Sequence, residues 1–486
     1  MQWPNKIAQQ IASVAGALRQ AVGGAPPVSA RYEAGSRRKR LSSWTGSRSG
    51  INTETKRSLR LIRQRSRDLV ANHWAAQRAK AVIASNVIGS GIKPTAKDNE
   101  ALSELLYRVC SGTQLDPRRR KTLYAIQELA LGAVVESGEC LIVRQRRTRS
   151  QMQRLRIDIP LQIQVLEADY LDELVDGMLP NGNFAIQGVE FDDIGAIVAY
   201  HLFEQHPGEV FQWSRQESRR VPAEDVIHLF EEWRPGQVRG LPWGVSAMVK
   251  MRDLSDYEDA QLLKQKLSAA LVGFIKDSGI GGPLDPLFDN NGVPETLSPG
   301  TMEYLRPGED VVFSTPPQVS GFKDFSQINA RAIAAAYNVT YESLTNDYSN
   351  VNFSSGRMGW IEMQRYIEHW QSDLMVAQMC LRVEEWIREA AQVMGIDASG
   401  PAWKWTPPRR EMIDPVKETA AALAAVRGGL NSMPDEITKM GRMPEEVAQE
   451  IAAWNALIDS MGIVLDSDPR RMSQAGQTQP DTSDED

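Results

Sequence analysis

The sequence predicts an α+β protein with more than one domain, because two periodicities alternate along its 486 residues. In several long stretches the apolar residues recur every three or four positions, which is the spacing of one face of a helix. Between about residues 140 and 230 they recur at every second position, which is the spacing of strands. A chain of this length is too long for one ordinary core, so we expect two to four domains.

The composition is that of a globular protein, with 42% hydrophobic and 24% charged residues. No run of eighteen apolar residues is present, so the sequence predicts no membrane span. Cys110, Cys140 and Cys380 lie far apart and lack CxxC spacing. This pattern favours reduced structural thiols in a cytosolic protein over a disulfide framework or a zinc site.

The net charge of −7 conceals two ends of opposite sign. Residues 1–78 hold fifteen Lys and Arg against three Asp and Glu, a net of +12, and residues 409–486 hold eight against fifteen, a net of −7. A basic end and an acidic end suit head-to-tail contacts between subunits or attraction to nucleic acid, although charge runs are most often solvated faces.

The first 54 residues are predicted to form a basic arm. Helical spacing from Ile7 to Val22 predicts a helix that either docks on a partner or orders only in an assembly, and residues 23–50 are expected to be extended. Candidates for contact with phosphate or with a partner are Arg37, Arg38, Lys39, Arg40, Arg60, Arg63 and Arg67. Salt bridges between subunits and docking of a scaffold protein explain these clusters equally well.

One helix is predicted from Thr55 to Val87, where apolar residues lie near heptad spacing and Gly89 and Gly91 follow. A second helix is predicted over residues 119–135. The strands that follow are expected at residues 140–144, 155–165, 184–190 and 195–203, with one more after Val221. These elements indicate a mixed α+β domain that ends in a Gly- and Pro-containing linker.

A long helix is predicted over residues 245–272, which contain neither Gly nor Pro. Residues 279–317 are dense in Pro and Gly, so we expect a small β-rich insertion there. Helical spacing of Ile328, Ala332 and Val339 then predicts a return helix. Helix, insertion and helix in this order would form a stalk with a knob, and repeating that unit around an axis would build a tube.

A polar loop follows the return helix and leads into a very long helix. Asn346, Asp347, Asn350 and Asn352 are turn formers that bond to their own backbone, so the loop is expected to be exposed. Ser354 or Ser355 is expected to cap a helix that reaches about Val393, roughly 55 to 60 Å long. Its predicted buried face consists of Met363, Ile367, Trp370, Leu374, Ala377 and Leu381.

The last part of the chain begins with Trp403, Lys404 and Trp405, which alternate aromatic and basic groups. This alternation suits either base stacking or a strand with both tryptophans buried against the long helix, and we favour the buried strand. Helices are predicted over residues 416–427 and 444–461. The acidic tail beyond Val464 has few apolar residues and is expected to be disordered.

The sequence contains no catalytic signature. It lacks a GxxxxGK[ST] loop, a GxSxG elbow and an HExxH pair, so we expect no P-loop ATP hydrolysis, no nucleophilic catalysis and no cofactor. Glu167, Asp169, Asp172 and Glu173 offer hard oxygen ligands for a divalent cation. Carboxylates at the end of a strand are usually solvated, however, so we predict no metal site.

Several segments, in one consistent order, resemble a known family. They are RYEAGSRRKRLSSW from Arg31, RSRDLVANHWAAQRAKAVIASNVIGSGIKP from Arg65, GVEFDDIGAIVAYHLFEQHPG from Gly188, RPGQVRGLPWGVSAMVKMRDLSDYEDAQLLKQKLSAA from Arg234, LSPGTMEYLRPGEDVVF from Leu297, FSQINARAIAAAYNVTYESLTNDYSNVNFSSGR from Phe325 and IDPVKETAAALAAVRGGLNS from Ile413. Together they span most of the chain, which resembles the lambda-type family of tailed-phage portal proteins.

The resemblance implies a portal fold whose subunits form a ring, usually of twelve. Its domains would be a basic N-terminal arm (1–54), an α+β wing (55–240), a stem helix (241–275), a β-rich clip (276–324), a stem return helix (325–339), a tunnel loop (340–354), a long wing helix with a following strand (355–408), a helical crown (409–464) and a disordered acidic tail (465–486). Asn346, Asp347, Asn350 and Asn352 would then lie at the DNA channel.

The resemblance also implies the function and partners. The ring would be the channel at one capsid vertex for DNA packaging, head–tail joining and genome ejection, without enzymatic activity. Its partners would be double-stranded DNA, the large terminase, the major capsid or scaffold protein and head-completion proteins, with no membrane contact during assembly. It would assemble in the bacterial cytoplasm and reside in the virion. Two alternatives are a DNA-processing protein, suggested only by the basic N-terminal third, and a phage scaffold protein without a channel.

Overall fold

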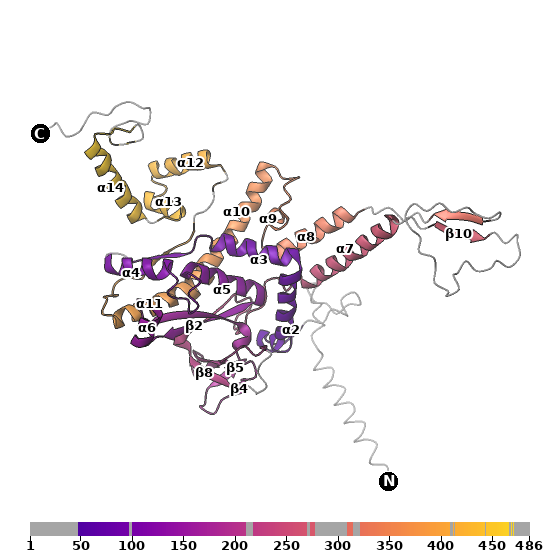
Figure 1. Cartoon of the computed structure of the whole chain (residues 1–486), viewed down its shortest axis with the longest axis horizontal. Helices are drawn as coiled ribbons and strands as arrows, with labels where there is room; N and C mark the ends of the chain where they lie inside the picture. Colours follow the sequence, from indigo (N-terminus) through magenta and orange to yellow (C-terminus); the bar gives the residue numbers. More distant parts are fainter. Residues whose placement is uncertain are drawn as a thin grey trace, which may run out of the picture. The chain divides into compact units, whose positions relative to one another are not determined.

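The computed structural model describes residues 47–96, 100–209, 217–269, 273–277, 309–313, 321–408, 412, 414–442, 444–465, 468 and 470. The chain divides into two compact units, Met1–Glu54 and Thr55–Asp486, and the second holds almost all of the described elements (Figure 1). The predictions for the N-terminal helix and the Arg37–Arg40 cluster, and for most of the Pro-rich insertion and of the acidic tail, lie outside the described residues.

Two helices, α2 (Ile51–Asn72) and α3 (Trp74–Val87), stand where one helix was predicted. His73 separates them with extended backbone angles, φ −114° and ψ 120°, and its side chain accepts a hydrogen bond from the N–H of Ala75. A side chain that caps in this way starts a new helix at the next residue. The prediction of one continuous helix is therefore wrong, because apolar spacing marks a buried face and does not reveal a break of one residue.

A three-stranded antiparallel sheet lies at the centre of the second unit. β2 (Glu139–Arg146) pairs with β3 (Leu161–Glu167) on one side and with β9 (Val226–Phe230) on the other. The helix α5 (Leu123–Ser137) contacts this sheet and leads directly into β2. A short helix, α6 (Arg149–Leu155), precedes β3, so the strand predicted over residues 155–165 begins only at Leu161.

A second, five-stranded sheet is an antiparallel meander. Its strands are β4 (Gly177–Met178), β5 (Phe184–Ile186), β6 (Val189–Phe191), β7 (Ile197–Phe203) and β8 (Ser218–Pro222), paired in that order. A small core of apolar residues from this sheet packs on Leu141 and Val226 of the central sheet. The predicted mixed α+β domain thus contains two sheets with separate cores. Short 3₁₀ helices at Ala168–Tyr170 and Ala223–Asp225 connect their strands.

The helices α7 (Met248–Ala269) and α8 (Phe322–Ala336) run side by side away from the sheets (Figure 1). The ring of Tyr257 on α7 packs against Phe322 and Phe325 on α8, with centroids 5.9 and 4.4 Å away. Between the two helices in sequence, β10 (Gly273–Asp277) pairs antiparallel with β11 (Glu309–Phe313). The predicted long helix and return helix are present, and the rest of the predicted insertion lies outside the described residues.

The very long helix is present but is not uniform. It consists of α10 (Phe353–His369), a π-helical segment (Trp370–Cys380) and α11 (Leu381–Val393). Of the predicted buried face, Ala377 and Leu381 are exposed, whereas Met375, Met379 and Val383 are buried. The π segment bonds from residue i to i+5, which shifts the buried face along the helix. Spacing by threes and fours could not anticipate that shift.

Seven further helices and strands are described. They are β1 (Lys93–Thr95), α4 (Glu100–Ser111), α9 (Tyr341–Thr345), β12 (Lys404–Thr406), α12 (Pro415–Arg427), α13 (Met433–Lys439) and α14 (Pro444–Met461). β12 pairs with β1, and Trp403 and Trp405 are buried, as predicted. β1, α4, α9 and α13 were not predicted. Among the described helices, none has the length and hydropathy needed to cross a membrane.

Candidate functional site

The polar loop between α9 and α10 is exposed, and its two ends are fixed by side chains. Asn346 ends α9 in the left-handed conformation, with φ 56°. Its side-chain Oδ1 accepts a hydrogen bond of 2.9 Å from the guanidinium of Arg78 on α3, which also donates to the carbonyl of Ser343. Asn tolerates a positive φ better than most residues. The start of the loop is thus tied to the body of the protein.

The far end of the loop is a helix cap. Asn352 accepts a hydrogen bond from the N–H of Ser355 at 2.8 Å, and the Ser355 hydroxyl accepts one from the N–H of Asn352 at 3.2 Å. This reciprocal arrangement is a capping box. The predicted caps, Ser354 and Ser355, both lie inside the helix. Ser355 contributes as the second half of the box.

Between these ends, Asp347 folds the loop back on itself. Its carboxylate accepts hydrogen bonds from the hydroxyl of Tyr341 at 3.0 Å and from the N–H and hydroxyl of Ser349. These hydrogen bonds hold the pKa of Asp347 below its ordinary value. Asn350 is exposed. The loop therefore presents amide and carboxylate groups to solvent on a short span with anchored ends.

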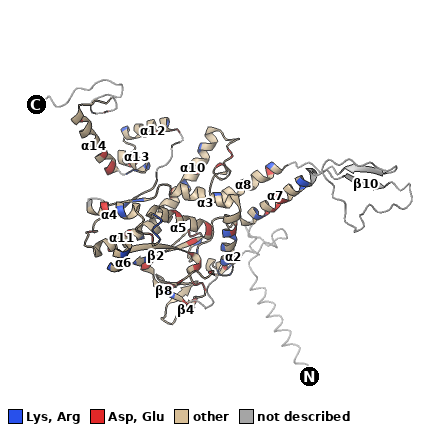
Figure 2. Ribbon diagram, viewed as in Figure 1, with Lys and Arg blue, Asp and Glu red and all other residues tan. Residues whose placement is uncertain are grey.

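The arginines predicted as phosphate contacts on α2 differ in their environments. Figure 2 shows Lys and Arg along this helix. Arg60 is exposed, but Arg67 forms ion pairs with Asp169 and with Glu167, the latter at 2.9 Å. Arg63 is 2% exposed and pairs with Glu139 inside the protein. Arg63 cannot reach a nucleic acid, so that prediction is wrong for this residue. Its charge is used in the fold.

Glu139, at the start of β2, is the centre of a buried charge cluster that the sequence did not reveal. Its Oε1 accepts hydrogen bonds from Arg63 and Arg239, and its Oε2 lies 2.8 Å from Nε2 of His228 and 2.7 Å from the N–H of Gly240. Burial by itself would raise the pKa of Glu139. The charges of Arg239 and Arg63 outweigh that effect and hold the pKa well below its ordinary value.

Two glycines allow the chain to approach this carboxylate. Gly138 has φ 90°, and a Cβ on Gly240 would lie 2.1 Å from the carbonyl oxygen of Gly138. No larger residue fits at that distance. The segment before α7 therefore packs directly on the start of β2. The buried charge cluster thus links α2, the central sheet and the segment that precedes α7.

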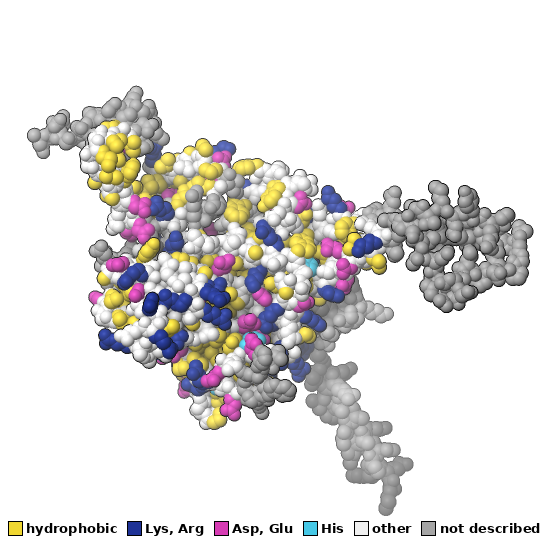
Figure 3. Space-filling view, in the orientation of Figure 1, with side chains coloured by type: hydrophobic (Ala, Val, Ile, Leu, Met, Phe, Trp, Pro, Cys, Tyr) yellow, Lys and Arg dark blue, Asp and Glu magenta, His cyan; other side chains and the backbone are white. Residues whose placement is uncertain are grey.

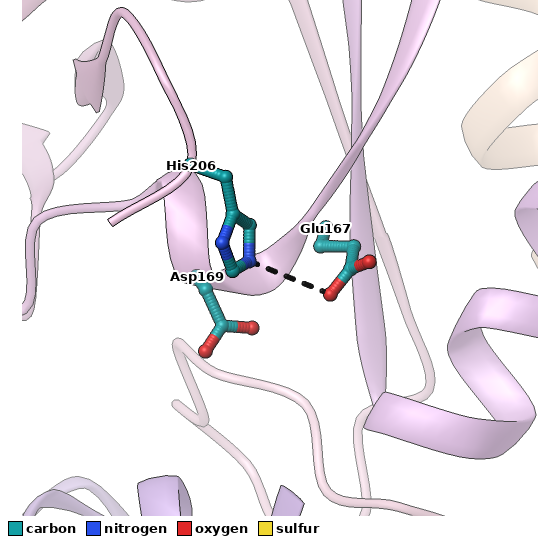
Figure 4. Close-up of side chains that lie close together, drawn as sticks. All are labelled: Glu167, Asp169 and His206. Carbon is teal, nitrogen blue, oxygen red and sulfur yellow. Dashed lines mark ion pairs between the residues drawn. The ribbon is translucent and has the colours of Figure 1, made fainter. Parts of the chain in front are cut away.

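A group of metal-binding residue types, Glu167, Asp169 and His206, lies close together (Figure 4). Asp172 and Glu173, predicted as further candidates, do not join this group among the described residues, and Asp172 instead accepts a hydrogen bond from Ser218 at 2.7 Å. The guanidinium of Arg67 already pairs with both carboxylates of the group. Because the guanidinium of Arg67 compensates the charge of these carboxylates, the arrangement favours an ion-pair cluster over a metal site.

A family model, phage portal protein of the lambda family, matches residues 37–371, which include the central sheet, the helices α7 and α8, and the polar loop. The chain belongs to this family. The predicted family is thereby confirmed, and it is one of structural portal proteins. The α+β fold class is confirmed as well.

Curated relatives carry the same description. The chain is 26% identical over 417 residues to a probable portal protein of Halomonas phage phiHAP-1, covering 80% of this chain and 79% of that protein. It is 24% identical over 307 residues to portal protein B of Escherichia phage lambda, covering 54% of this chain and 57% of that protein.

Two solved structures are among those to which the chain is similar. One is the neck of a native gene transfer agent particle with C12 symmetry, with 15% identity, a TM-score of 0.45, and coverage of 78% of this chain and 93% of that one. Another is an HK97 family phage portal protein from Corynebacterium diphtheriae, with 12% identity, a TM-score of 0.33, and coverage of 71% and 94%.

Proposed function

We propose that this portal-family chain assembles into a closed ring, of twelve subunits as the family resemblance implies, whose central channel passes double-stranded DNA at one vertex of the virion. In this proposal the ring serves DNA packaging, head–tail joining and genome ejection. The domain boundaries given above for wing, stem, clip, tunnel loop and crown are part of the same proposal. The observation that carries it is the exposure of the stalk formed by α7 and α8.

The outer part of α7 contacts α8 but is not buried by the described part of the subunit. Across residues 255–266, no residue of this helix is buried. Leu262 and Leu263 are 50% and 59% exposed, and Ile328 on α8 is 64% exposed. Apolar side chains on an exposed helix stabilise the protein only when another surface covers them. A neighbouring subunit in a ring would cover each stalk in the same way.

Negative-stain microscopy of the purified protein tests this proposal. We expect annular particles with a central hole, because a heterologous interface closes into a ring when its repeated rotation brings the last subunit back to the first. A protein that remains a single copy or forms only open oligomers at every concentration and salt tested would contradict the proposal. That result would support the scaffold without a channel.

The loop from Asn346 to Asn352 is proposed as the channel constriction. Replacing residues 347–351 by three glycines keeps Asn346 bonded to Arg78 and keeps the Asn352 cap. We expect rings to form normally, but particles to lose packaged DNA, because the shortened loop lacks the polar side chains of Asp347, Ser349 and Asn350. DNA content per particle is the measurement. Replacing the turn residues 192–195 with three glycines is the control, and normal DNA retention by the loop variant would refute the role.

Residues 279–317, within the proposed clip, are proposed to contact the large terminase during packaging and head-completion proteins afterwards, while the major capsid or scaffold protein contacts the ring elsewhere. Asp277 and Glu309 are paired across β10 and β11. An Asn-Gly turn can therefore replace residues 278–308 and close the two strands as a hairpin. We expect this variant to form rings that no longer bind terminase in a pull-down. Terminase binding at the wild-type level would exclude this assignment.

A further inference from the structure

A concentrated basic surface lies outside the regions already discussed. We call it the α6 basic patch, and it combines the loop before α5 with α6 and its flanking residues. Its members are Arg118, Arg119, Arg120, Lys121, Arg147, Arg149, Arg154 and Arg156. Figure 3 shows Lys and Arg side chains gathered on the part of the body where Figure 1 places α6. Residues 112–121 and 147–156 together contain eight basic residues and one acidic residue, Asp116.

Hydrogen bonds join the two segments into one surface. The guanidinium of Arg119 donates to the carbonyl oxygens of Leu155 and Arg156, at 2.8 and 3.3 Å, where α6 ends. The carboxylate of Asp116 accepts hydrogen bonds from the backbone N–H groups of Arg118 and Arg120 at 3.0 and 2.8 Å. The acidic residue is thus occupied with the backbone of its own loop, and the loop is held against the end of the helix.

Four guanidinium groups of the patch are free for a ligand. Arg120, Arg149, Arg154 and Arg156 are exposed, and none forms an ion pair with a carboxylate in the described part of the chain. The nearest counterexample is Arg146, which pairs with Asp225 at 2.7 Å. Grouped like charges repel one another until an anion neutralises them. The α6 basic patch is therefore suited to binding a polyanion.

The chemistry of the patch favours phosphate over protein. None of the large exposed apolar side chains of the described residues lies in residues 112–121 or 147–156. Protein interfaces usually contain an apolar or aromatic core, whereas arginine forks match the oxygens of a phosphate. The seven residues of α6 span roughly 10 Å, along which duplex DNA carries about six charges.

We propose that the α6 basic patch binds the phosphate backbone of double-stranded DNA on the outside of the protein. This contact is separate from passage of DNA through a channel, where tight phosphate binding would hinder sliding. It requires no ring, so it can be tested on the full chain in any state of assembly. If the protein forms no rings, the proposed DNA binding by the α6 basic patch is unaffected. If the patch does not bind DNA, the proposed ring assembly is unaffected.

The test variant is R120Q/R149Q/R154Q, whose three side chains are exposed. Binding to a 30-base-pair duplex is measured by fluorescence anisotropy from about 50 to 200 mM salt. We expect affinity at the low end to fall at least about tenfold, and the slope of log K against log salt to become shallower by about 2.7, which is about 0.9 for each lost phosphate contact. The matched control is K250Q/K266Q/K323Q on α7 and α8, which removes the same charge at exposed positions and should keep the wild-type slope.

Two competitors identify the ligand and its location. Covalently closed circular DNA cannot thread through a closed ring, so it should compete fully if the contact is external. An acidic peptide of equal charge should compete poorly. An unchanged salt slope in the triple variant, failure of the circle to compete, or equal competition by the peptide would each overturn the proposal. Circular dichroism and thermal melting of the triple variant confirm that its fold is intact.

Discussion

Replacing Glu139 with glutamine should lower the free energy of unfolding by about 3 to 5 kcal/mol, because the change removes the shared counter-charge of two buried guanidiniums. Arg239 is fully buried and Arg63 is 2% exposed, so water cannot solvate either charge in the folded state. Glutamine keeps the size of the side chain, which separates loss of charge from loss of packing. Chemical denaturation monitored by circular dichroism measures the effect.

The matched control is Glu136→Gln, three residues earlier. Glu136 pairs with Lys80, and both side chains are partly exposed, 22% and 32%. A pair of this kind contributes only about 0 to 1 kcal/mol. A loss of stability in E139Q no larger than in E136Q would contradict the central role of Glu139. Adding Arg63→Gln to E139Q should cost less than the sum of the two single changes, since both act on one cluster.

The same cluster predicts how stability depends on pH. The pKa of Glu139 is depressed in the folded state, so its stabilising effect is complete above the ordinary pKa of 4.5 and is lost as the pH falls toward the folded value. Glu190 in the five-stranded sheet follows the same rule. Burial would raise its pKa, but hydrogen bonds from Arg220 and Asn183 lower it to about 2. Wild-type protein should therefore lose stability below pH 4.5, and E139Q should lose less.

Local signals were enough to predict the stalk helices α7 and α8 and the approximate length of the helix through α10 and α11. For α7 the signal was the absence of Gly and Pro over residues 245–272, and for the other helices it was the helical spacing of their apolar residues. The break at His73 and the π segment from Trp370 to Cys380 were not predictable in this way. Both depend on hydrogen bonds that alter the backbone without altering residue spacing. Tertiary contacts decide whether the backbone forms a continuous α-helix or contains a break or a π segment.

For the functional residues, too, features set by the local sequence could be predicted and features set by tertiary contacts could not. The exposed turn formers of the polar loop could be recognised, because Asn and Asp bond to nearby backbone. Arg63 could not be distinguished from Arg60 in the sequence, because the two lie on one helix. They differ in that Arg63 lies on the face that contacts Glu139, whereas Arg60 is exposed. That contact joins residues 76 positions apart. A basic run in a sequence therefore identifies charge, and only the fold decides whether the charge faces solvent.

Replacing Leu262 and Leu263 with glutamate is expected to abolish ring assembly while leaving the subunit folded. In the isolated subunit these side chains are 50% and 59% exposed, so the change costs little there. In a ring the same surface is covered at every subunit. Each lost leucine forfeits up to about 1.5 to 3 kcal/mol of burial at each contact, and each glutamate would leave a buried carboxylate without a partner.

Size-exclusion chromatography with light scattering and negative-stain microscopy distinguish the states, since L262E/L263E should elute as a monomer with an unchanged melting temperature. The control places the same substitutions at Leu174 and Ile194, which are 80% and 83% exposed in the five-stranded sheet region. If exposure of apolar residues in general drove association, L174E/I194E would lose assembly too. Rings formed by L262E/L263E would show that the stalk does not hold neighbouring subunits together, because a closed ring cannot tolerate a charged defect repeated at every interface.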